Sequence, residues 1–145
     1  MSQDQAERIE LADGIAAALV AHARAAAPRE CCGFLVGAGR RVDEYVPTAN
    51  VDPNPSRYQI DPAAHIALNR RLRGSARSIL GVCHSHPRGG DAPSPSDIVE
   101  AAYREFVQVI VSLEDPETPT IRAYRITEGI VISIALMVGP NGSSS

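Results

Sequence analysis

Two histidines separated by a single residue place the strongest constraint on how this chain folds. His84 and His86 follow a short, apolar and partly β-branched run, residues 78–83 (SILGVC). Such a run predicts a buried strand that ends at the histidines. Strand side chains alternate between two faces, so His84 and His86 leave the strand on one side and Ser85 on the other. Two imidazoles placed in this way can converge on one metal ion.

The segment after the histidines offers a third ligand. Ser94 is a natural N-cap, Pro95 suits the first helical position, and Asp97 falls in the first turn of the predicted helix. A helix N-terminus keeps a carboxylate ionised, as a metal ligand must be. Two imidazoles and one carboxylate leave a fourth position for water, which is typical of a catalytic zinc site. Asp97 could instead be only a capping-box residue, and Asp91 in the Gly-rich loop is a weaker substitute ligand.

This spacing, H-x-H, seven residues and then S-x-x-D, resembles the motif of the JAMM (MPN-plus, Mov34/PAD-1-like) zinc isopeptidases. From the His, Ser and Asp frequencies of this chain, such a match is expected by chance in about one such sequence in two thousand. Upstream, residues 28–37 (PRECCGFLVG), which include Glu30, are similar to the glutamate-bearing strand of that family. The resemblance covers nearly the whole chain, because similar residues of bacterial members also match Asn50, Pro55, Tyr58, Asp61 and Pro62.

The resemblance implies a role for each of five residues. One zinc ion per chain would be bound by His84, His86 and Asp97. Glu30 would be the general base that takes a proton from water and passes it to the leaving amine. Ser94 would donate a hydrogen bond to the tetrahedral oxyanion. Without the motif, Glu30 would be interpreted as a surface carboxylate. The helix-capping role of Ser94 competes with its catalytic role, although one hydroxyl can both donate and accept.

The resemblance also implies the reaction and its substrate. We expect a zinc metallopeptidase that cleaves an amide or isopeptide bond at the C-terminal Gly-Gly tail of a ubiquitin-like or sulfur-carrier protein. The groove for an extended tail is expected to lie between the loop joining His86 to Ser94, with Arg88 as a candidate contact, and the acidic loop after Leu113. The chain lacks room for the long insertions of eukaryotic deubiquitinating members, so polyubiquitin is a less expected target.

Two other classes of function stay open. A catalytically silent scaffold of the MPN type should have lost metal ligands, whereas every ligand is present in this chain. A zinc hydrolase or deaminase-like enzyme acting on a small molecule would share the metal and the fold. The H-x-E and P-C-x-x-C signature of nucleobase deaminases is absent, however.

Hydrophobic periodicity and turn residues predict an α/β chain with a mixed β-sheet flanked by helices. This agrees with the cytidine-deaminase-like JAMM/MPN fold that the resemblance implies. We expect one domain, residues 1–138, followed by a disordered tail, residues 139–145. The predicted helices span 12–27, 62–73 and 95–105, a loop spans 47–56, and the predicted strands span 8–11, 32–36, 42–46, 58–60, 78–83, 107–113, 120–126 and 130–138.

Composition narrows the expected partners and compartment. A net charge of −3, 4% aromatic residues and the lack of a long basic run argue against a nucleic-acid surface. The polar, acidic start differs from a signal peptide, and the longest apolar run, residues 130–138, is too short to cross a bilayer. We therefore expect a cytoplasmic protein that binds no membrane. Three cysteines without a C-x-x-C pair predict no disulfide, with Cys83 packed in the core.

Overall fold

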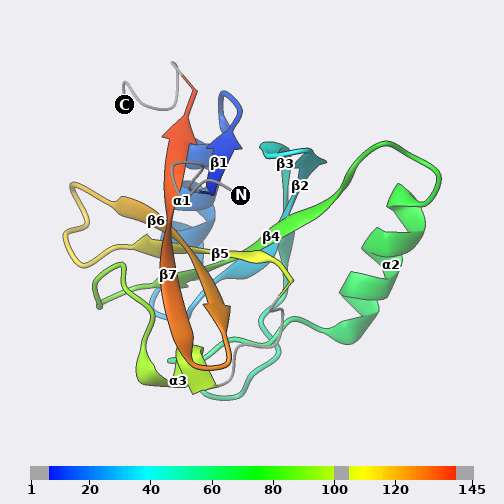
Figure 1. Cartoon of the computed structure of the whole chain (residues 1–145). Coiled ribbons are helices and arrows are strands. Elements are labelled where there is room, and N and C mark those ends of the chain that lie inside the picture. Colours follow the sequence, from blue (N-terminus) through cyan, green and yellow to red (C-terminus); the bar gives the residue numbers. More distant parts are fainter. Residues whose placement is uncertain (1–6, 100–104, 140–145) are drawn as a thin grey trace.

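The computed structural model of the chain describes residues 7–99 and 105–139. Within them, seven strands form one sheet around which three helices are arranged (Figure 1). The strands are β1 (Arg8–Leu11), β2 (Cys32–Ala38), β3 (Arg41–Thr48), β4 (Ser78–His86), β5 (Val107–Ser112), β6 (Thr120–Thr127) and β7 (Ile130–Val138). The helices are α1 (Ile15–Ala26), α2 (Pro62–Leu72) and α3 (Pro95–Val99).

The sheet mixes parallel and antiparallel pairs and closes into a barrel, in the order β1-β3-β2-β4-β5-β6-β7. β4 pairs in parallel with β5, whereas β2 pairs antiparallel with both β3 and β4. The predicted mixed sheet flanked by helices is confirmed. The closure was not predicted: short β1 pairs in parallel with β3 on one side and with β7 on the other. The four residues of β1, RIEL, alternate between charged and apolar side chains, and such a pattern carries no information about which strands lie beside it.

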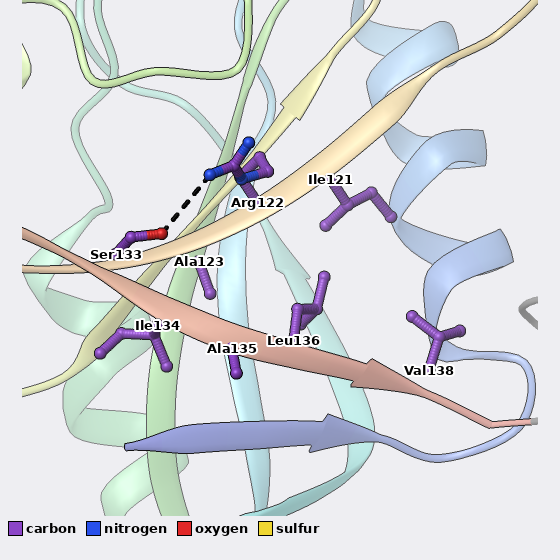
Figure 2. Close-up of a pocket in the computed structure, with 8 residues that line it drawn as sticks. All are labelled: Ile121, Arg122, Ala123, Ser133, Ile134, Ala135, Leu136 and Val138. Atoms are coloured by element: carbon purple, nitrogen blue, oxygen red, sulfur yellow. Dashed lines mark hydrogen bonds between the residues drawn. The ribbon is translucent and has the colours of Figure 1, made fainter. Parts of the chain in front are cut away.

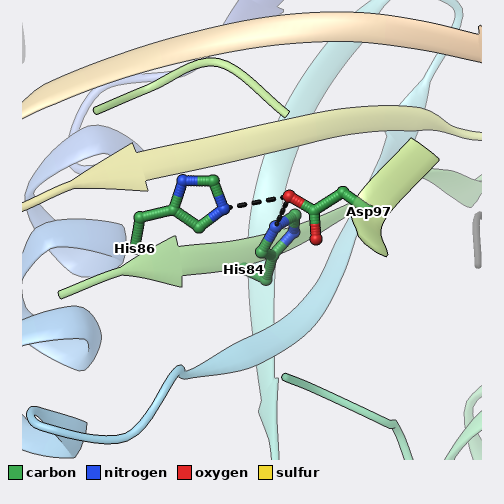
Figure 3. A group of neighbouring side chains, drawn as sticks. All are labelled: His84, His86 and Asp97. Atoms are coloured by element: carbon green, nitrogen blue, oxygen red, sulfur yellow. Dashed lines mark hydrogen bonds and ion pairs between the residues drawn. The ribbon is translucent and has the colours of Figure 1, made fainter. Parts of the chain in front are cut away.

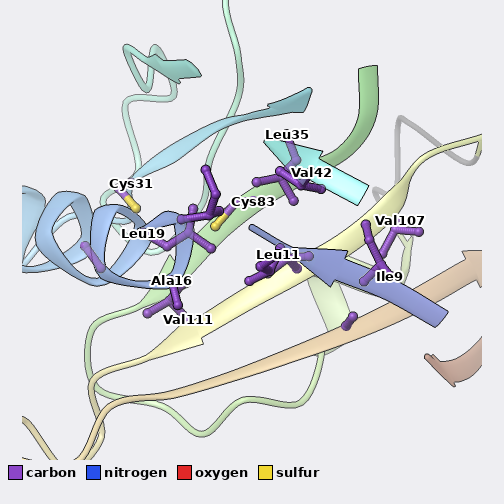
Figure 4. Packing of buried hydrophobic residues seen from close by; sticks show 14 of the residues in the cluster. Ile9, Leu11, Ala16, Leu19, Cys31, Leu35, Val42, Cys83, Val107 and Val111 are labelled. Carbon is purple, nitrogen blue, oxygen red and sulfur yellow. The ribbon is translucent and has the colours of Figure 1, made fainter. Parts of the chain in front are cut away.

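Two helices cover opposite faces of the central strands β2 and β4. On one face, Leu19 of α1 packs into the cluster that contains Cys83 (Figure 4). On the other face, Leu68 of α2 packs into the cluster that contains Phe34 and Val82. Burial of a large apolar side chain stabilises the fold by about 1.5–3 kcal/mol, so β2 and β4 are strongly fixed. The end of β4 carries His84 and His86, and Glu30 lies just before the start of β2.

The three cysteines belong to this packing. Cys31, Cys32 and Cys83 are free and buried, and Cys83 lies in the α1 cluster as predicted. Burial raises the pKa of all three thiols, that of Cys32 to about 11. Thiolate, the reactive form, is therefore scarce at neutral pH.

Local sequence signals set several element ends correctly. The Asp61 carboxylate accepts a hydrogen bond from the Ala63 amide at 2.9 Å and caps α2, with Pro62 in the first turn as predicted. The predicted closing hairpin is also confirmed. Glu128 and Gly129 join its strands with φ angles of 51° and 80°. Two positive φ angles suit the right-handed twist of a two-residue hairpin, and glycine adopts them without strain.

Other predicted elements were wrong in their extent. Residues 58–60 form no strand, because only an isolated bridge joins Asn50 to Ile60. Pro47 belongs to β3 rather than to the following loop. α1 begins at Ile15 instead of Ala12, since Gly14 before it has a φ of 88°.

The end of the third helix falls partly outside the described residues. α3 is described to Val99, and Glu105, its predicted end, lies in a turn. The predicted disordered tail lies outside the described residues except for Gly139. None of the helices in the described part of the chain is long and apolar enough to span a membrane.

Candidate metal centre

The last residues of β4 carry the histidine pair. His84 and His86 are buried, with 1% and 8% of their surfaces exposed. Both imidazoles are directed toward Asp97 at the start of α3 (Figure 3). Ser85 points to the opposite side, where its hydroxyl accepts a hydrogen bond from the Cys31 amide at 2.8 Å. The alternation of strand side chains thus brings the two histidines together, as the sequence predicted.

Asp97 combines two roles that the sequence left as alternatives. Its Oδ2 atom accepts the Ser94 amide at 2.9 Å, and its own amide donates to the Ser94 hydroxyl at 3.1 Å. This reciprocal pair is a capping box. The same Oδ2 atom lies 3.2 Å from Nε2 of His84 and 3.0 Å from Nε2 of His86. The cap therefore fixes the carboxylate where it meets both imidazoles.

The donor atoms of these three residues fit a metal ion. One ligand atom from each lies within 4.8 Å of the others. Two ligands bound tetrahedrally at zinc distances lie about 3.3–3.4 Å apart, close to the observed separations. When Nδ1 of His86 donates to the Gly90 carbonyl at 2.7 Å, the neutral ring presents the Nε2 lone pair toward the carboxylate, as a metal ligand must. Without metal, a proton on Nε2 can instead be shared with Asp97. Asp91, the substitute ligand, is not in this group.

The contact between Asp97 and the two histidines shifts the pKa values of Asp97 and His86 in opposite directions. Burial raises the pKa of Asp97, but its hydrogen bonds with His84 and His86 outweigh burial and hold that pKa well below its usual value. Burial lowers the pKa of His86, but the hydrogen bonds to Asp97 and Gly90 outweigh it, and the net shift is upward. Asp97 is thus ionised over the whole working pH range, as a metal ligand must be.

Glu30 lies just before β2, which is the neighbour of β4, and only 7% of its surface is exposed. Its Oε1 atom is buried and has no hydrogen-bond partner among the described residues. Burial raises its pKa to about 8, with nearby Asp97 and Asp52 adding to the shift against the opposing effect of His86. Such a carboxyl is a poor structural element and a suitable proton acceptor.

One cleft brings most of the predicted residues together. Its volume is about 520 Å³, and Glu30, His86, Arg88 and Ser94 are among its lining residues. A different hollow of about 420 Å³ lies over β6 and β7 (Figure 2). Its lining is mainly aliphatic and contains none of the predicted site residues. The first cleft is therefore the candidate site.

The sequence did not predict how some neighbouring residues contact the site. The Tyr58 ring stacks on His84, with centroids 4.4 Å apart and planes 17° from parallel. The Gly90 carbonyl orients His86, and the Ser112 hydroxyl donates to the Gly89 carbonyl at 2.5 Å and steadies the same loop. The family resemblance pointed to Tyr58, but no spacing rule reveals a stacking partner far away in sequence.

The raised pKa of Glu30 predicts how stability depends on pH when metal is absent. The carboxyl is protonated in both folded and unfolded chains below its ordinary pKa of 4.5. Above that pH the Glu30 carboxyl ionises in the unfolded chain, whereas in the folded chain it stays protonated until the pH approaches about 8. The free energy of unfolding should therefore fall across this window by up to about 1.4 kcal/mol per pH unit.

Urea unfolding of chelator-treated protein at a series of pH values measures this effect. Glu30→Gln lacks the titrating group, so the difference between its free energy of unfolding and that of the parent isolates the Glu30 contribution. Curves for the two proteins that run parallel from pH 4.5 to 8 would contradict the assignment.

Comparison with known proteins agrees with this geometry. Residues 13–127 match the family described as prokaryotic homologs of the JAB domain. The CysO-cysteine peptidase of Mycobacterium tuberculosis is 32% identical over 116 residues, which are 79% of this chain and 80% of that protein. The "Probable TtuB-protein conjugate cleaving protease" of Thermus thermophilus is 35% identical over 118 residues, 81% of this chain and 75% of that protein.

The fold matches a solved structure as well. A Desulfitobacterium hafniense protein with a known solution structure superimposes with a TM-score of 0.81 at 27% identity, covering 90% of this chain and 92% of the other. The family resemblance noted in the sequence is thereby confirmed. The chain belongs to the prokaryotic homologs of the JAB domain, a compact form of the JAMM/MPN family.

Proposed function

We propose that this protein is a zinc metallopeptidase that hydrolyses an amide or isopeptide bond at the C-terminal Gly-Gly tail of a ubiquitin-like or sulfur-carrier protein. The observation that carries the proposal is the convergence of three metal-ligand atoms beside a cleft that also contains a buried, unpartnered Glu30 oxygen. The names of the two relatives, which describe cleavage of a CysO-cysteine adduct and of TtuB-protein conjugates, support this substrate class.

His84, His86 and Asp97 would hold one zinc ion. When bound, zinc lowers the pKa of a water ligand to about 7 and polarises a carbonyl. The positive charge would also lower the pKa of Glu30 below its metal-free value of about 8, which makes the ionised carboxylate available at neutral pH.

Glu30 and Ser94 then carry the proton and oxyanion chemistry. The unpartnered Oε1 atom of Glu30 accepts a proton from the attacking water and later gives it to the leaving amine, so the carboxylate is regenerated. The Ser94 hydroxyl accepts the Asp97 amide and lies 3.2 Å from the Ser96 hydroxyl, where either oxygen can donate. When Ser96 donates, the Ser94 proton is available for the oxygen that gains negative charge. One serine can therefore cap the helix and serve the reaction.

A direct test uses a small ubiquitin-like protein whose C-terminal Gly-Gly is extended by a peptide or linked to a lysine. The zinc-loaded chain should release the protein ending at Gly-Gly, as seen by mass spectrometry, and a chelator should stop the reaction. Intact substrates of both kinds after prolonged incubation would contradict the proposed function.

The walls of the cleft predict which tails are cleaved. Pro28, Pro55 and Pro87 line it together with Gly89, and the proline rings make these parts of the wall rigid. Replacing the penultimate substrate glycine by valine should lower kcat/KM by at least about tenfold, since overlap with these walls misplaces the carbonyl. Initial rates on the two substrates measure this effect. Equal rates would show that the cleft is open at this position.

A further inference from the structure

The loop between β3 and α2 contains an asparagine with an unusually complete set of hydrogen bonds. Nδ2 of Asn50 donates to the carbonyl oxygens of Glu30 at 3.0 Å and Arg57 at 2.9 Å. Its Oδ1 accepts from the amides of Asp52 at 3.0 Å and Gln59 at 3.1 Å. An amide side chain has two donor hydrogens and two acceptor lone pairs, and all four are used.

This asparagine holds the backbone of Glu30. The carbonyl of Glu30 accepts from Asn50, and the amide of Glu30 donates to the Pro55 carbonyl at 3.2 Å. Arg29, the preceding residue, donates to the Asp52 carbonyl at 2.6 Å. Both polar backbone groups of Glu30 are thus attached to one loop.

The loop has little regular structure of its own to keep this arrangement. Only one isolated bridge, between Asn50 and Ile60, connects its two ends. Because the Asn50 side chain joins residues 52, 57 and 59 to Glu30, it determines how this loop lies against the start of β2. Pro55 and Ser56 of the same loop line the cleft beside Glu30.

We propose that Asn50 is a positioning residue that fixes the Glu30 backbone, and through it the carboxyl group, relative to the metal ligands. This inference rests on the proposed function only for the role of Glu30 as the base. A displacement of about 1 Å in a reacting group can lower a rate by about 100-fold. The Asn50 contacts leave the metal ligands untouched, so metal binding should not depend on them.

The test compares Asn50→Ala with Asn50→Asp and with the control Asn54→Ala. Aspartate keeps the acceptor for the loop amides but cannot donate to the Glu30 carbonyl when ionised. It therefore tests the loss of this donor even if the alanine variant loses the structure of the whole loop. Asn54 belongs to the same loop, where its side chain accepts the Ser56 amide at 2.9 Å. Both Asn50 variants should lower kcat about 10- to 100-fold with smaller changes in KM. The Asn54 variant should keep kcat within about threefold.

Two further readouts separate positioning from general damage. Zinc content and the visible spectrum of the cobalt(II)-substituted protein should be unchanged in all three variants. Amide hydrogen exchange of Glu30 should accelerate in the Asn50 variants, whereas the Cys31 amide, held by Ser85, should stay protected. Measuring exchange requires no substrate, so this result stands even if the proposed reaction is wrong.

A double-mutant cycle gives the decisive comparison. If Asn50 acts through Glu30, Asn50→Ala should lower kcat far less in a Glu30→Gln background than in the parent. Full additivity of the two effects would overturn the inference, as would an unchanged kcat in both Asn50 variants or an unchanged exchange rate at Glu30. Failure of the parent protein to cleave any Gly-Gly substrate would instead contradict the proposed function.

Discussion

Replacement of both His84 and His86 by alanine is expected to abolish metal binding and activity together. Only Asp97 would then remain of the three candidate ligands, and a single carboxylate cannot hold zinc against competing water. Metal analysis after dialysis should find less than about one tenth of a zinc per chain, compared with one in the parent. Peptide release should fall to the level of buffer.

His22→Gln provides the matched control for this prediction. His22 is a partly buried histidine on α1, and its Nδ1 atom lies 2.6 Å from the Tyr45 hydroxyl, outside the metal-ligand group. Glutamine can keep a hydrogen bond to the tyrosine, so zinc content and activity should stay at the parent level. Undiminished zinc in the His84, His86 double variant would place the metal elsewhere.

The ligand group was predictable because each of its parts depends on local structure. His84 and His86 share one face of a single strand, and strand alternation alone brings them to one side. Asp97 is fixed by Ser94 three residues earlier through a capping box, which the sequence displays directly. Only the meeting of the strand end with the helix start needed information beyond these two segments, and the motif spacing supplied it.

Features that depend on contacts between residues far apart in the sequence could not be predicted from local sequence patterns. The place of Glu30 in the cleft requires the pairing of β2 with β4, and the family resemblance rather than periodicity indicated it. Residues 58–60 alternate like a strand, yet the Gln59 amide donates to the Asn50 side chain, and only the isolated bridge, in which the Val51 amide donates to the Gln59 carbonyl, joins the two segments. Barrel closure through β1 depends on two parallel partners that its own sequence does not specify.

Glu30→Gln should separate catalysis from metal binding. Glutamine has nearly the same shape but cannot accept a proton, so kcat should fall by about 10²- to 10⁴-fold while KM changes little. Oε1 of Glu30 has no hydrogen-bond partner among the described residues, so the substitution breaks no hydrogen bond at that atom. Steady-state cleavage of a Gly-Gly-linked substrate measures the rate. Zinc content and thermal unfolding check that the variant still binds metal and is folded.

Glu128→Gln is the control for loss of a carboxylate, because Glu128 is exposed in the turn between β6 and β7 and is not among the residues that line the cleft. This variant should keep the parent rate, since its carboxylate has no buried position from which to exchange protons with substrate. A Glu30→Gln enzyme with zinc bound and activity within a few-fold of the parent would assign the base to another residue. Loss of zinc together with activity would instead show that Glu30 supports the metal centre, and the proton-transfer role would be wrong.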